Sequence, residues 1–138
     1  MVPKFKAWHK SMQRMSEVLA ISFERQKVKI RHLRGTTHMT VPFNDVELMQ
    51  STGLFDKNGK EIFESDIVKT TIFFGRADES GGFYEYEKEL IGIVKQLEGA
   101  WVIDTEKGAV YLWSDINENE VLGNIWENPK LLEEIKDE

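Results

Sequence analysis

Acidic residues are the most abundant groups in this sequence that could perform chemistry. They recur at short spacing in four places, at Glu61/Glu64, Asp78/Glu79, Glu85/Glu87/Glu89 and Glu118/Glu120. General acid–base catalysis needs two carboxylates held in different environments inside a pocket. The spacing of two in the run 85–89 instead places three glutamates on one face of a strand, which is typical of a solvated strand. We therefore expect no catalytic carboxylate pair, and the alternative is a site for a cation or a basic partner.

One short motif resembles the start of a calcium-binding loop. Asp56 and Asn58 have the spacing of the first two oxygen ligands. However, Gly59 comes two positions too early, and Lys60 stands where a third oxygen ligand belongs. A hairpin turn explains these residues better, so we expect no metal site here.

The histidines and the potential nucleophiles also lack a recognisable arrangement. His32 and His38 are six residues apart, with Arg34 between them and no nearby carboxylate in the sequence. No serine, threonine or lysine stands in a nucleophile motif, and no glycine-rich phosphate loop is present. We expect structural or surface roles for the histidines. We also expect a protein that is not an enzyme and that uses no cofactor, and the sequence identifies no small-molecule substrate.

Charge is unevenly distributed along the chain. Residues 1–43 hold nine Lys/Arg and two Asp/Glu, which gives a net charge of +7. Residues 44–138 hold nine Lys/Arg and 22 Asp/Glu, which gives a net charge of -13. Such asymmetry can mark nucleic-acid binding. The basic segment can also pair with the acidic remainder, within one chain or between subunits, and we favour this interpretation. The expected partner is therefore a second copy of the chain in a homo-oligomer.

Nucleic acid is the alternative partner, and the basic segment supplies the candidate residues. Two rows of basic side chains alternate along predicted strands, and one of the rows includes a tryptophan. Phosphate neutralisation combined with base stacking would be the mechanism. Against it, the net charge of -6 for the whole chain weakens the long-range attraction of a polyanion. The candidate contact residues are Lys4, Lys6, Trp8, Lys27, Lys29 and Arg31.

Size and composition are those of an ordinary globular protein. A chain of 138 residues suits one domain or two small ones, and 41% hydrophobic residues are enough to form a core. The absence of cysteine excludes disulfides and thiolate zinc sites. No apolar run approaches the roughly 20 residues that span a bilayer, and the N-terminus has no apolar secretory segment. We expect a cytoplasmic protein with no membrane partner.

Strand-like periodicity accounts for most of the chain. It predicts strands at 5–8, 15–23 and 28–33 in the basic segment, and at 60–63, 67–74, 90–97, 101–104, 110–113 and 121–125 in the remainder. Residues 75–89 are typical of a long hairpin, whose aromatic side chains we expect to touch the body of the protein. Short strands at this spacing indicate a small antiparallel barrel or sandwich.

Two short helices complete the prediction. Asn44 or Asp45 can cap a helix that runs to about Gln50, and Gly53 would end this helix in a left-handed conformation. The Asn-Pro pair at 128–129 opens a C-terminal helix, because Asn is a preferred N-cap and Pro is favoured at the first helical position. The expected fold is therefore mainly β with short helices.

Two long segments resemble the signature segments of a known family, the YopX family of phage and prophage proteins. They are MQSTGLFDKNGKEIFESDIVK (49–69), which contains the strong turn signal DKNG, and VLGNIWENPKLL (121–132). The opening FKAWH (5–9) is similar to the start of that family, which more often has Asp where this chain has His9. The family also more often has Gly where this chain has Ser65. If that turn needs a positive φ, Ser65 is strained by about 1 kcal/mol.

The resemblance implies an organisation as well as a setting. It implies a mainly β protein with a small SH3-like antiparallel barrel in its later part. Combined with the predicted elements, this gives a basic N-terminal β segment with a short helix at 1–55, and the barrel with a C-terminal helix at 56–138. It also implies a self-associating protein of phage genomes or integrated prophages in bacterial host cells. The family has no established catalytic or ligand-binding residues, so none are carried over to this chain.

Overall fold

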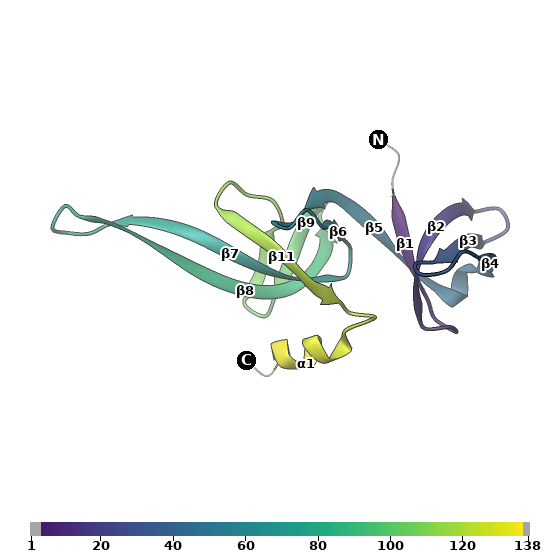
Figure 1. Cartoon of the computed structure of the whole chain (residues 1–138). Helices are drawn as coiled ribbons and strands as arrows, with labels where there is room; N and C mark the ends of the chain where they lie inside the picture. Colours follow the sequence, from purple (N-terminus) through teal and green to yellow (C-terminus); the bar gives the residue numbers. More distant parts are fainter. Residues whose placement is uncertain (1–3, 137–138) are drawn as a thin grey trace. The chain divides into compact units, whose positions relative to one another are not determined.

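The computed structural model describes residues 4–136 and shows a mainly β protein (Figure 1). The chain divides into two compact units between Ser51 and Thr52. This boundary falls inside strand β5 (Val46–Phe55), whereas the sequence places the division at the end of that strand. We call residues up to 51 the first unit and the remainder the second unit.

The first unit is a curved antiparallel sheet that encloses its own core. Its elements are β1 (Phe5–His9), β2 (Arg14–Ser22), β3 (Lys27–His32), β4 (His38–Pro42), a single 3-10 turn η1 (Phe43–Asp45) and the first part of β5. The strand order is β4-β3-β2-β1-β5. The part of β5 that follows Ser51 belongs to the second unit, together with its neighbour β6 (Glu61–Phe63). Alternate residues point inward, so one apolar face forms the core, with Ala7, Val28, Ile30, Val41 and Val46.

The helix expected at about 45–50 is wrong. These residues form the start of β5, which is paired with β1 in a register that sets Leu48 opposite Ala7. The ladder to β1 gives the backbone of β5 its partners, and this tertiary pairing overrides the weak local helix signal. Gly53 has a φ of 77°, so the left-handed conformation expected there is present, but it lies within the strand and ends no helix.

The second unit is built on a five-stranded antiparallel sheet. Its strands β7 (Asp66–Ala77), β8 (Phe83–Leu97), β9 (Ala100–Thr105), β10 (Gly108–Tyr111) and β11 (Asn117–Asn124) lie in the order β10-β9-β8-β7-β11, and α1 (Pro129–Lys136) follows. The core contains Ile62, Val68, Val94, Ile103 and Leu112. The sheet is open, because β10 and β11 are its two edges and do not pair with each other. The sheet therefore does not close into the expected SH3-like barrel.

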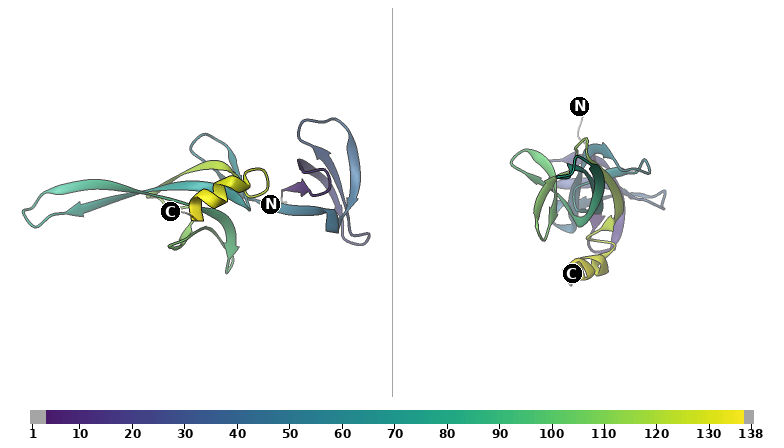
Figure 2. Two further views of the ribbon diagram at one scale, coloured as in Figure 1. Left: turned by 90° about the horizontal axis from the view of Figure 1, so that it is seen from below. Right: turned by 90° about the vertical axis from the view of Figure 1, so that its left-hand side faces the viewer.

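Strands β7 and β8 extend well beyond their neighbours. They pair from Ile67 opposite Ile93 as far as Ala77 opposite Phe83, whereas β11 pairs with β7 only as far as Ile72. Residues 73–87 therefore form a two-stranded arm that projects from the second unit (Figures 1 and 2). The expected long hairpin is confirmed. The expectation that its aromatic side chains touch the body is wrong, because those on β8 are exposed, with Phe83 at 68%.

Among the described residues, no helix combines the length and the apolar character that a membrane crossing requires.

Candidate interaction surfaces

Five of the six basic-segment candidates lie on one face of the first unit. The register sets Lys6 opposite Glu17, and Glu17 opposite Arg31, so β1, β2 and β3 present these side chains on the same side. Lys27 and Lys29 alternate with buried residues on β3 and share this face. Trp8 follows Lys6 by two residues on β1 and belongs to it as well. We call this surface, with Lys6, Trp8, Lys27, Lys29 and Arg31, the basic face.

Several of these candidates already have partners within the unit. Arg31 forms an ion pair with Glu17 at 2.5 Å. Trp8 is half-buried, with Met15 and Glu47 as its cross-strand neighbours. Lys27 and Lys29 are exposed, and neither makes an ion pair among the residues that the structure describes. The sixth candidate, Lys4, lies just before β1, where its carbonyl oxygen accepts a hydrogen bond from the N–H of Ser51.

The opposite face of the same sheet holds a buried chain of polar side chains. His9 Nε2 lies 2.8 Å from Asp45 Oδ2, and His9 Nδ1 lies 3.0 Å from His32 Nε2. His32 Nδ1 in turn lies 3.4 Å from a guanidinium nitrogen of Arg14. Both imidazoles are buried, and Ser11 Oγ donates to Asp45 Oδ2 at 2.7 Å. This network was not predicted from the sequence, because Asp45 is 36 positions from His9 and only the fold brings them together.

One arrangement of protons satisfies every hydrogen bond in this network of side chains. His9 Nε2–H donates to Asp45, which makes His9 Nδ1 the acceptor for His32 Nε2–H. His32 Nδ1 is then the acceptor for Arg14. Both rings are neutral in this arrangement. Protonation of His32 would place an N–H at Nδ1, next to the positively charged guanidinium of Arg14. The network therefore favours neutral His32.

The pKa values of His32 and Asp45 follow from their positions in this network. Burial lowers the pKa of His32, and repulsion by His9 and Arg14 lowers it further. The hydrogen bond from the Ser11 hydroxyl lowers the pKa of Asp45, against the effect of burial and together with the contact to His9. The network therefore favours an ionised carboxylate at Asp45 and a neutral imidazole at His32, next to Arg14.

Ser11, His9 and Asp45 include the residue types of a hydrolytic triad, but their geometry differs from one. In a triad the serine and the acid bind opposite ring nitrogens, so that the base can take the serine proton. Here Ser11 Oγ and Asp45 Oδ2 both lie beside His9 Nε2, and the serine donates to the carboxylate. The arrangement joins the turn after β1 to η1, and it does not activate a nucleophile.

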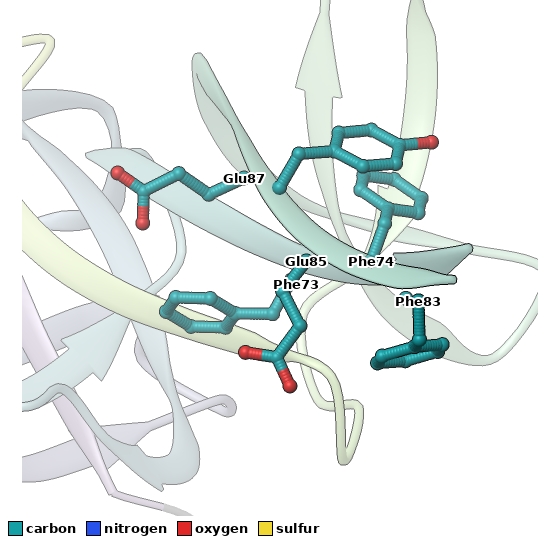
Figure 3. A pocket seen from close by; sticks show the side chains of 7 residues that line it. Phe73, Phe74, Phe83, Glu85 and Glu87 are labelled. Carbon is teal, nitrogen blue, oxygen red and sulfur yellow. The ribbon is translucent and has the colours of Figure 1, made fainter. Parts of the chain in front are cut away.

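The arm of the second unit presents a different chemistry on each of its sides. On one side Phe74 stacks on Tyr86, with ring centroids 4.9 Å apart and planes 13° from parallel, and Tyr84 lies next to Tyr86. On the other side Phe83 lies over Gly75, where an added Cβ would come within 2.5 Å of the ring. Figure 3 shows Phe74 on one side of the strands and Phe83 on the other.

The second side of the arm combines aromatic rings with carboxylates. An open hollow of about 610 Å³ lies along it, and its lining includes Phe73, Phe83, Glu85 and Glu87 (Figure 3). The register sets Phe73 opposite Glu87 and Gly75 opposite Glu85. Because a ring face carries negative partial charge, rings beside carboxylates form a surface suited to a cationic group.

The recognisable segment 49–69 has a structural explanation rather than a chemical one. Asp56 Oδ1 accepts hydrogen bonds from the N–H groups of Asn58 and Lys60, and its Oδ2 accepts one from Val121. Burial raises the pKa of Asp56, but these three hydrogen bonds outweigh it and leave the pKa below its usual range. The carboxylate therefore fastens the turn to β11. Nowhere in the described part of the chain do three potential ligands gather into a metal-binding group.

The second recognisable segment, 121–132, also serves the fold. Asn124 Oδ1 accepts hydrogen bonds from the N–H groups of Trp126 and Glu127, which turns the chain from β11 toward α1. Asn128 Oδ1 accepts a hydrogen bond from the N–H of Asn124, and a Cβ added at Gly123 would clash with the Asn128 side chain. Glycine at position 123 therefore leaves room for this amide.

Comparison with known proteins agrees with the sequence resemblance. The family model described as YopX protein matches residues 4–133. Protein EF1440 from Enterococcus faecalis has a similar crystal structure, with 25% identity and a TM-score of 0.53 over 96% of this chain and 99% of that one. Protein yopX from Bacillus subtilis is similar in fold, with 18% identity and a TM-score of 0.56 over 93% and 96% of the two chains. No curated protein matches the chain.

Proposed function

We propose that this chain, which belongs to the YopX family, is a non-enzymatic phage or prophage protein. In this proposal it acts in the cytoplasm of a bacterial host cell by assembling with copies of itself and by binding other proteins. The segregation of charge between its two units carries the proposal. Electrostatic complementarity of this kind guides association and fixes the register of partners.

The structure gives this segregation a defined location in each unit. Lys27 and Lys29 stand exposed on the basic face of the first unit. On β8 in the second unit, Glu85, Glu87 and Glu89 stand exposed on one side of the strand. Neither set makes an ion pair within the described residues, so both remain available to a partner of opposite charge.

Light scattering at several salt concentrations tests the proposal. We expect a mass above that of a 16.0 kDa monomer at micromolar concentration in low salt. The association should weaken as salt rises, because added ions screen exposed charges beyond ~10 Å at 0.1 M. A monomeric mass at both low and high salt would contradict self-assembly.

Nucleic-acid binding is the second candidate, and the layout of the basic face favours it. Lys6, Lys27, Lys29 and Arg31 lie on one face together with Trp8, so phosphate contact and base stacking could occur on a single surface. Retardation of single-stranded or double-stranded DNA or RNA in low salt tests this candidate. Binding should fall steeply as salt rises, and no retardation in low salt would exclude it.

A further inference from the structure

We infer that β3 of one copy docks along the arm of another copy, with the basic row Lys27, Lys29 and Arg31 facing the acidic row Glu85, Glu87 and Glu89. This inference rests on the proposed self-assembly and names the surfaces that perform it. The two rows match in spacing and are opposite in charge, and aromatic rings lie beside the acidic row.

The acidic row is regular and exposed. Its three glutamates alternate on β8 and point to one side of that strand, with Glu85 and Glu87 in the arm and Glu89 at its base. Successive carboxylates are therefore about 7 Å apart along the strand. No oppositely charged side chain of the described residues forms an ion pair with any of the three. On the strand beside them, Thr71, Phe73 and Gly75 are their cross-strand neighbours, and none of these carries a charge. Nothing in the arm itself therefore neutralises the row.

The basic row has the matching period and the opposite sign. Lys27, Lys29 and Arg31 alternate with buried residues on β3, so their side chains also recur about every 7 Å on one face. Two strands laid face to face can therefore bring the rows into contact charge by charge. Arg31 is held by Glu17 within its own sheet, which leaves Lys27 and Lys29 as the stronger contributors.

The aromatic rings of the arm add a second attraction for the same groups. Phe73 lies opposite Glu87, and Phe83 lies over Gly75, which is itself opposite Glu85. A lysine that reaches either carboxylate therefore passes a ring, and its ammonium gains cation–π attraction while its methylene stem covers the ring. Phe73 and Phe83 are 46% and 68% exposed, so such contact would also remove apolar surface from water.

Charge reversal in both rows, followed by mixing, tests the inference. One variant carries Lys27→Glu, Lys29→Glu and Arg31→Glu, and the other carries Glu85→Lys, Glu87→Lys and Glu89→Lys. Each variant alone should associate at least ~100-fold more weakly than the wild type, because like charges then face each other. An equimolar mixture should recover association, since the reversed arm of one variant fits the reversed β3 of the other with the original complementarity.

The controls separate this inference from the broader proposal. Glu79→Lys, Glu106→Lys and Asp115→Lys make the same change in net charge at exposed positions outside the row and should leave the association unchanged. If the wild type assembles but both row variants assemble equally well, the inference is wrong and self-assembly stands. If the reversed variants stay apart after mixing although both are folded by circular dichroism, the rows do not face each other. If the wild type never assembles, the proposed function itself fails.

Discussion

The two units of this protein use buried polar groups in different ways. In the first unit the buried polar groups include two imidazoles, His9 and His32, which form hydrogen bonds to each other and to a carboxylate. In the second unit they include the carboxylates Asp56 and Asp66, which accept hydrogen bonds from backbone N–H groups. Imidazoles titrate near neutral pH and carboxylates near pH 4. Each unit should therefore lose stability in its own range of pH, although both are small antiparallel sheets.

Removal of the Asp56 carboxylate should have the largest effect on the second unit. Asp56→Ala leaves three N–H groups without their acceptor, at a position where the side chain is only 7% exposed. We expect a loss of about 3 kcal/mol in the free energy of unfolding, which urea denaturation would measure. The matched control is Asp78→Ala, because Asp78 also accepts three hydrogen bonds but is exposed at the tip of the arm. Equal losses in the two variants would contradict the importance of burial.

Mild acid should weaken the first unit before it weakens the second. The pKa of His32 is below its ordinary value of 6.5 in the folded chain, so the unfolded chain binds more protons as the pH falls below about 6.5. Stability from this group is present above pH 6.5 and is lost as the pH falls toward the lowered pKa. The pKa of Asp56 lies below its ordinary value of 3.8, so its contribution is lost only in stronger acid, below about pH 4.

Hydrogen exchange followed by NMR can measure this difference unit by unit. Between pH 7 and 5, the amides of β1 and β3 should lose protection while those of β7 and β9 keep it. His32→Gln should flatten this dependence, because the amide can still donate to His9 but does not titrate. If the amides of β1 and β3 lose as much protection in His32→Gln as in the wild type between pH 7 and 5, a group other than His32 causes the pH dependence.

Ser65→Gly should stabilise the second unit by about 1 kcal/mol. Ser65 has a φ of 73°, a left-handed conformation that strains residues with a Cβ. The complementary change is Gly59→Ala, at a φ of 81° with no atom within 4 Å of the added Cβ, so it tests backbone strain alone. It should destabilise by about 1 kcal/mol. Thermal unfolding measures the midpoint temperature of both variants. A change of the same sign in the two midpoints would contradict backbone strain as the cause.

The smallest effect should come from the surface ion pairs of the two units. Lys57 Nζ lies 2.9 Å from Glu120 Oε2 in the second unit, and Lys10 Nζ lies 3.0 Å from Glu47 Oε1 in the first. The contact with Glu120 raises the pKa of Lys57, and the contact with Lys57 lowers that of Glu120. Double-mutant cycles should give a weak coupling for both pairs that disappears in high salt, because exposed charges are screened. A coupling that survives high salt would contradict this.

Local sequence signals predicted the elements whose conformation depends on residues only a few positions apart in the sequence. The alternation at 28–33 indicated β3, and the DKNG turn at 56–59 indicated the return into β6. The positive φ of Ser65 was anticipated from the family resemblance, because the family more often has Gly at this position. The helix at about 45–50 failed for the converse reason, since the ladder between β1 and β5 joins residues some forty positions apart.

The sequence by itself determined the mainly β class, the family, and the opposite charge of the two parts of the chain. The fold class and the charge depend on periodicity and composition, and the family on the resemblance of the segments 49–69 and 121–132, none of which needs knowledge of strand pairing. Only the tertiary structure decided that His9, His32 and Asp45 meet, because three separate elements must converge to join them. It also decided that Phe73 and Phe83 stand exposed beside glutamates on a projecting arm, since exposure depends on where the neighbouring strands stop.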